Sequence, residues 1–182
     1  MRNFLSALAA LLVCASLQAQ DFSISTNLLG YANLGTLNLD ASYGVARHWT
    51  VGAGVRYNPF TFGSGAGEKS YRQRSVAAGA RYWPWHIFSG WWLAGKVQAQ
   101  EYSAGGFASP QTTEGDRLGA GLSGGYTYML GRHFNIDLGI GVWSGMDRYV
   151  VYQCQHCGQV TDSGSKTFFL PNDFLLSLSY IF

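Results

Sequence analysis

The residues best suited to chemistry form one short motif, Cys154-Gln155-His156-Cys157, within a long polar segment. Two cysteines this close in sequence are able to form a disulfide, and we expect one because it suits an oxidising compartment at the cell surface. A redox pair is a weaker interpretation, since no helix N-terminus is evident to lower a thiol pKa. Metal binding by Cys154, His156 and Cys157 would need a fourth ligand from a second chain, and free thiols would need a reducing environment.

Catalysis has little support elsewhere in the chain. An enzyme at the outer rim would need a histidine close to an aspartate or a serine, and His156 with Asp162 or Asp147 is the candidate group. The remaining histidines fall at expected turns or rims, where a structural role is more common: His48, His86 and His133. We therefore expect no catalytic residue, no bound metal and no cofactor, and we keep a loop-based enzyme as an alternative.

Charged side chains also fall on the inward faces of expected strands. A buried charge without a partner is costly, so we expect these residues to pair in a network of salt bridges that fills the interior. A selectivity filter or a proton path is the alternative interpretation. The residues are Asp40, Arg56, Arg81, Lys96 and Asp137.

The elements that position these charges are strands whose side chains alternate in character. Between Thr36 and Val45, apolar side chains alternate with Asn38, Asp40 and Ser42, which gives the strand one apolar and one polar face. In a membrane strand the apolar face contacts lipid and the polar face lines the interior. Eight segments are expected as strands: residues 22–29, 36–45, 49–59, 72–83, 91–102, 117–130, 134–149 and 174–182.

The last of these strands ends the chain on an aromatic residue. Tyr180 and Phe182 share its apolar face, whereas Ser177 and Ser179 lie on the opposite face. A terminal strand of this kind is typical of outer-membrane barrels, and we interpret Tyr180 and Phe182 as the signal read by the barrel assembly machinery during insertion. Because every backbone group in a bilayer must be paired, the strands must close on themselves.

The sequence therefore predicts an all-β fold, an eight-stranded antiparallel up-and-down transmembrane β-barrel of the smallest size class. Short turns near residues 46, 86 and 131 are expected at the periplasm, and longer outer loops at 60–71, 103–116 and 150–168. Side chains fill the interior of so narrow a barrel, which argues against a porin. A soluble lipocalin-like barrel is the alternative fold, but its apolar faces would point inward.

The beginning of the chain indicates export. Residues 1–20 form a predicted signal peptide with a basic start, an apolar stretch from Phe4 to Val13, and cleavage after Ala19 or Gln20. The apolar stretch is shorter than the roughly 20 residues that a spanning helix needs. Residues 21–182 then form one barrel domain in the outer membrane. Only 12% of residues are charged and the net charge is +2, which argues against nucleic-acid binding.

Several segments together resemble the domain of unknown function 3575 family of Bacteroidota. The resemblance covers nearly the whole expected mature chain and implies a small outer-membrane barrel without assigned catalytic residues. It also implies gene neighbourhoods that contain fimbrillin-type adhesins and their anchors. The segments that carry it are Thr26-Asn27-Leu28-Leu29, Arg47-His48-Trp49-Thr50-Val51-Gly52, Tyr57-Asn58-Pro59-Phe60, Arg81-Tyr82-Trp83, Tyr126-Thr127-Tyr128-Met129-Leu130-Gly131-Arg132 and the loop from Cys154 to Cys157.

These observations favour a structural or interaction protein rather than an enzyme. A filled barrel beneath long outer loops, above all 150–168, is expected to contact outer-membrane lipid and a surface partner, such as a fimbrial assembly component. One alternative is an accessory subunit of a larger outer-membrane complex that docks through its barrel wall. A loop-based enzyme is the other.

Overall fold

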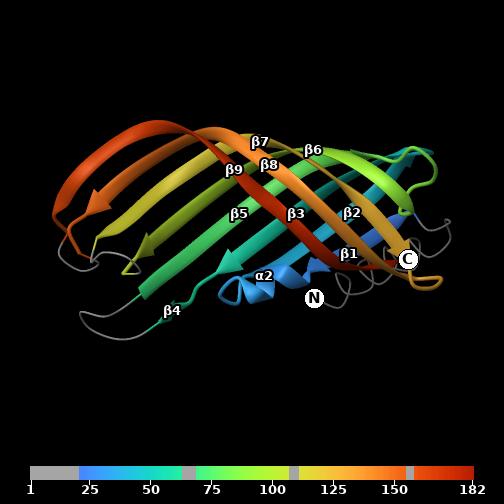
Figure 1. Ribbon diagram of the computed structural model, residues 1–182, viewed down its shortest axis with the longest axis horizontal. Helices are drawn as coiled ribbons and strands as arrows, with labels where there is room; N and C mark the ends of the chain where they lie inside the picture. Colours follow the sequence, from blue (N-terminus) through green and yellow to red (C-terminus); the bar gives the residue numbers. More distant parts are fainter. Residues whose placement is uncertain (1–20, 63–68, 107–110, 155–157) are drawn as a thin grey trace, which may run out of the picture.

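The computed structural model describes residues 21–62, 69–106, 111–154 and 158–182, with only the backbone of Phe62, Asn172 and Asp173. Antiparallel strands make up nearly all of it, so the all-β prediction is confirmed (Figure 1). The described part holds no helix that is long and apolar enough to cross a membrane. The elements are β1 Phe22–Asn27, α2 Leu28–Ala32, β2 Leu37–Ala46, β3 Trp49–Asn58, β4 Thr61–Phe62, β5 Lys69–Tyr82, β6 Gly90–Gly105, β7 Thr112–Met129, β8 Phe134–Tyr152 and β9 Val160–Ile181.

The strands form one sheet that closes into a ring. Each of the long strands pairs with its neighbours in sequence, β3 pairs with β5, and β9 pairs with β1. Eight strands therefore make the ring, and the short β4 adds to the edge of β5 through Thr61 and Phe62. Ring closure pairs strands from opposite ends of the sequence and removes the two sheet edges over the paired region.

The ring is strongly staggered. Following paired residues from Tyr180 on β9 through one residue of each strand leads back to β9 at Phe169, 11 residues away. With strands about 4.8 Å apart and residues about 3.3 Å apart along a strand, this stagger inclines every strand by about 45° to the ring axis. The inclination brings residues of non-adjacent strands together inside the ring.

The two ends of the ring differ. One, which we call the turn end, holds the short connections at residues 47–48, 83–89 and 130–133, the start of β1 and the end of β9 (Figure 1, right). At the other, the loop end, β5 to β9 extend well beyond β1, β2 and β3 (Figure 1, left). The ring is therefore tall on one side and short on the side where α2 lies.

Side chains alternate along the strands in the sense opposite to a soluble core. Large apolar side chains are exposed on the outer surface, whereas polar side chains are buried inside. Exposed examples are Leu39, Val55, Val97, Leu118, Leu122, Ile140 and Phe174. Buried examples are Ser23, Asn38, Thr50, Ser123, Thr127, Asn135, Ser177 and Ser179.

The loop end differs from the sequence-based prediction. The prediction that residues 150–168 form the longest loop is wrong, because β8 continues to Tyr152 and β9 begins at Val160. The outer segments near 60–71 and 103–116 are likewise shortened by β4, β5, β6 and β7. Polar residues there alternate as strand residues because these strands continue past the apolar part of the outer surface. The first expected strand, conversely, ends early: the Asn27 side chain accepts a hydrogen bond from the Leu29 amide and begins α2.

An apolar plug closes the turn end. The connection between β5 and β6 folds inward, so that Phe88 packs edge-on against Trp83, with ring centroids 5.9 Å apart. Trp92 and Ile181 complete the buried cluster. Asn135 donates a hydrogen bond to the Phe88 carbonyl at 2.6 Å, which fixes the connection inside the ring.

Candidate functional site

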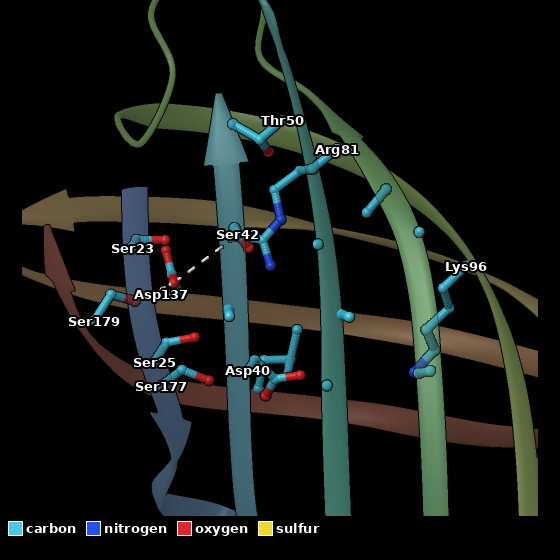
Figure 2. A pocket seen from close by; sticks show the side chains of 18 of the residues that line it. Ser23, Ser25, Asp40, Ser42, Thr50, Arg81, Lys96, Asp137, Ser177 and Ser179 are labelled. Atoms are coloured by element: carbon cyan, nitrogen blue, oxygen red, sulfur yellow. Dashed lines mark hydrogen bonds and ion pairs between the residues drawn. The ribbon is translucent and has the colours of Figure 1, made fainter. Parts of the chain in front are cut away.

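The interior above the plug holds a small polar cavity of about 120 Å³. It is the candidate site because its wall combines charged side chains with serines and glycines. The five charged residues that the sequence analysis expects to face inward all line this one cavity: Asp40, Arg56, Arg81, Lys96 and Asp137. The seryl groups Ser23, Ser177 and Ser179 border it as well (Figure 2).

Asp137 and Arg81 form the best-defined charge pair of this cavity. Arg81 Nη1 lies 3.8 Å from Asp137 Oδ2, and the line between them crosses the interior from β5 to β8 (Figure 2). Ser179 Oγ donates to the same carboxylate at 2.8 Å, and Thr127 Oγ1 donates to its other oxygen. The guanidinium also lies 4.1 Å from the Trp92 ring centroid. The carboxylate therefore has both a counter-charge and hydrogen bonds, as a buried ion requires.

The other three charges belong to the loop-end half of the cavity. Asp40 is packed so closely against Gly54 that the absent side chain of this glycine makes room for the carboxylate. The Lys96 stem similarly passes over Gly121. Asp40, Arg56 and Lys96 each have interaction partners. Glycines on β3 and β7 thus let long charged side chains fit into a narrow interior.

A second charged cluster lies nearer the loop end. The Asp147 side chain is fully buried and accepts hydrogen bonds from Tyr102 Oη at 3.0 Å and Arg117 Nε at 3.2 Å. Lys166 Nζ lies 3.9 Å from the same carboxylate. The guanidinium of Arg117 stacks 3.9 Å from the Tyr102 ring centroid and 5.7 Å from that of Phe168. This cluster ties four strands together across the upper interior.

The electrostatics of this cluster affect Tyr102. Its pKa is raised from 10.0 to about 12: burial is the largest cause, the charge of Arg117 opposes it, and the hydrogen bond and charge of Asp147 add to it. Tyr102 lies beyond the apolar part of the outer surface, because its outward neighbours in the ladder are the exposed Glu101, Asp116 and Arg148. The phenol therefore stays protonated and donates to Asp147 throughout the physiological pH range.

Sequence reasoning missed this second cluster. Asp147 entered only as a possible partner of His156, and Arg117 and Lys166 were placed at a strand start and in a loop. The signal was present in β8, where Trp143, Asp147 and Tyr149 all share the inward face. This signal was hard to recognise in the sequence, because the outward-facing residues that alternate with these three change from apolar to charged along β8.

The histidines at the turn end make a repeated backbone contact. His48 Nδ1 lies 2.9 Å from the Trp83 carbonyl, and the Trp83 amide donates to the His48 carbonyl at 2.9 Å. His133 makes the same pair of contacts with Ile181, at 2.9 and 2.8 Å. Because a carbonyl only accepts, each Nδ1 carries the proton. These contacts fasten the turns to the next strand and account for both histidines structurally.

The cysteine motif lies largely outside the described residues. Cys154 follows β8, whereas His156 and Cys157 are not described, so the disulfide stays a prediction. Within the described residues, no group of three or more histidine, cysteine, aspartate and glutamate side chains could hold a metal ion. The predicted signal peptide, residues 1–20, also lies outside them.

Comparison with known proteins bears on the family of the chain. A family model described as "Protein of unknown function (DUF3575)" matches residues 5–182, nearly the whole chain. A search of curated proteins finds no match. The resemblance inferred from the sequence motifs is therefore confirmed at the level of the family.

Proposed function

We propose that this chain, which belongs to the DUF3575 family, is an integral outer-membrane β-barrel with a filled interior. The description of the family gives no function. It acts as a structural or interaction protein through its loop end, without catalysis. The partner we propose is a surface protein, and a fimbrial assembly component in particular, as the family resemblance suggests.

The observation that carries this proposal is the inverted distribution of polar and apolar side chains. Leu118, Leu122 and Ile140 are 66%, 64% and 70% exposed on the outer surface, while serines, threonines and asparagines are buried inside. A soluble protein rarely exposes so continuous an apolar surface. Lipid would cover this outer surface around Leu118, Leu122 and Ile140, which we call the apolar belt. Because the ring is closed, most strand edges within the belt are paired, as a bilayer requires.

Aromatic contacts at the turn end support the same orientation. Exposed rings form edge-on or tilted pairs there, as in Trp91 with Tyr126 at 5.2 Å and Phe134 with Tyr180 at 5.1 Å. Amphipathic aromatic rings favour the membrane–water interface. At the loop end the outer surface changes to charged residues, including the Arg74–Glu101 pair, which suits water.

Insertion into lipid vesicles tests the proposal. We expect residues 21–182, folded from urea in the presence of vesicles, to migrate differently on SDS gels before and after heating. Tryptophan fluorescence should be quenched by lipids brominated on their acyl chains, because Trp49 and Trp91 are exposed on the outer surface. A monodisperse, folded protein in buffer without detergent, unquenched by these lipids, would contradict the proposal.

The filled interior is tested separately. The plug, the small cavity and the two charged clusters support a filled interior, so we expect no steady single-channel conductance in planar bilayers. A stable open level would contradict the filled interior while leaving membrane insertion intact. Crosslinking in cells followed by mass spectrometry would identify the partner.

A further inference from the structure

The two edges of strand β9 differ in how much of their length is paired with another strand. One edge pairs with β8 from Val160 to Tyr180. The other pairs with β1 only from Ser177 to Ile181. In the described part of the chain, no strand pairs with this second edge between Val160 and Leu176. We call this stretch the free edge.

The lower part of the free edge, next to the apolar belt, has few unsatisfied groups. Asn27 continues the β1 ladder with its side chain, because Nδ2 donates to the Phe174 carbonyl at 3.0 Å and Oδ1 accepts from the Leu176 amide at 3.2 Å. Pro171 follows within a β-bulge opposite Val142 and has no N–H to leave unpaired. Beyond Pro171 the described edge has one such contact, because the Ser163 amide donates to Asp162 Oδ1 at 2.8 Å.

The backbone direction along the upper free edge follows from these contacts. Phe174 and Leu176 point their backbone groups toward β1, so even-numbered residues face this edge below the bulge. The bulge adds one residue to β9, so odd-numbered residues face the free edge on the side of the bulge toward Val160. The amides and carbonyls that face the free edge therefore belong to Ser163, Ser165, Thr167 and Phe169. Their neighbours, such as Gly164 and Lys166, use their backbone groups on β8.

The upper free edge is also accessible. All residues from Val160 to Thr167 are exposed, although Asp147 directly across the ladder from Lys166 is buried. On the outer surface Ser165 continues a charged row formed by Glu101, Asp116 and Arg148. The upper edge thus projects past the apolar belt into water, where a strand with unpaired N–H and C=O groups is a template for another strand.

We propose that the free edge of β9 at Ser165–Thr167 binds an extended segment of a partner protein by antiparallel strand addition. The proposal rests on the proposed function, since it names the surface through which the barrel would interact. Backbone groups in a row require a peptide backbone as their partner. The matching segment is extended and carries an apolar residue to cover Phe169, which is 69% exposed.

A second copy of this chain does not fit the free edge. Two copies in one membrane would be related by an axis along the membrane normal. Their β9 strands, each inclined by about 45° to that axis, would cross at about 90° and could not form a ladder. The occupant is therefore an extended segment of a different protein.

A peptide-binding measurement on the vesicle-inserted protein tests the proposal. The probe is a fluorescent synthetic peptide of residues 144–152, because this sequence forms an antiparallel ladder with the same β9 residues on their other edge. We expect saturable binding to the wild type and to Ser165→Ala, which keeps the backbone donor. Ser165→Pro removes that donor from the free edge, and we expect binding about tenfold weaker. Thr167→Pro with Thr167→Ala forms a second matched pair.

The probe itself provides a control that leaves the protein unchanged. In a peptide N-methylated at both Arg148 and Tyr149, the methyl groups remove one backbone N–H donor from each edge of the peptide strand. This peptide is expected not to bind. Equal binding to Ser165→Pro and Ser165→Ala, or no saturable binding of the unmodified probe to inserted wild-type protein, would overturn the proposal. A wild type that fails to insert into vesicles would contradict the proposed function instead.

Discussion

Arg81 and Asp137 form an ion pair across the interior of the ring, with Arg81 Nη1 3.8 Å from Asp137 Oδ2. They come from β5 and β8, which are not neighbours in the sheet. Two strands therefore separate the partners, and the pair braces one side of the wall against the other. The Asp137 side chain is 8% exposed and that of Arg81 27%, so the pair has only limited contact with water.

Asp137→Asn should destabilise the protein by about 3 kcal/mol, because it removes the Asp137 charge that lies opposite the Arg81 guanidinium inside the ring. Urea unfolding of the vesicle-inserted protein, followed by tryptophan fluorescence, measures the loss. The double variant Arg81→Gln/Asp137→Asn should recover part of it, since neither charge remains. Glu101→Gln is the matched control: its partner Arg74 is 70% exposed, and the cost should stay below about 1 kcal/mol. Full additivity of Arg81→Gln and Asp137→Asn would show that the pair is not coupled.

Tyr102 should titrate at about pH 12 rather than at 10.0. Absorbance at 295 nm, as the difference between the wild type and Tyr102→Phe, measures this pKa. Because the pKa is raised on folding, the contribution of Tyr102 to stability is full below pH 10 and is lost as the pH rises through about 12. Asp147→Asn should lower the pKa, since both the charge and the hydrogen bond of Asp147 raise it. An unchanged pKa in this variant would mean that burial alone sets it.

Local alternation was enough to predict the central parts of the eight strands that form the ring and the inward position of several charged residues. Asp40, Arg56 and Arg81 line one cavity because each falls on the polar face of its strand. Alternation does not predict which of the inward charges form pairs. The contact between Arg81 and Asp137 depends on the stagger of the whole ring, and no short stretch of sequence contains that information.

The loop end was the hardest part to predict. Alternation between apolar and polar residues reports a strand only where one face contacts an apolar environment. Beyond the apolar belt the outward face of β8 and β9 turns polar, as at Arg148 and Ser165, so the apolar and polar residues no longer alternate there. The Asn27 side chain caused the opposite error, because it both caps α2 and continues the ladder of β9.

Close approach of backbones predicts a severe effect of Gly145→Ala. A Cβ at Gly145 would meet the backbone of Leu118 and Gly119 on β7, and backbone in a closed ring has little room to move. We expect a loss of more than about 2 kcal/mol, measured by the same urea titration. Gly131→Ala is the control, because a Cβ there has nothing within 4 Å, and its effect should be within about 0.5 kcal/mol. Similar stability of the two variants would contradict the packing between β7 and β8.

The apolar belt predicts different outcomes for the same new charge at two heights on β7. Leu122 is 64% exposed at the middle of the proposed belt, so Leu122→Arg should lower the stability of the inserted protein by about 2–4 kcal/mol, the cost of arginine near the bilayer midplane. Glu114→Arg changes an exposed residue at the loop end, where water solvates the charge, and should change it by less than about 1 kcal/mol. Urea unfolding in vesicles measures both. If the two variants are equally stable, lipid does not cover Leu122 and the proposed position of the belt is wrong.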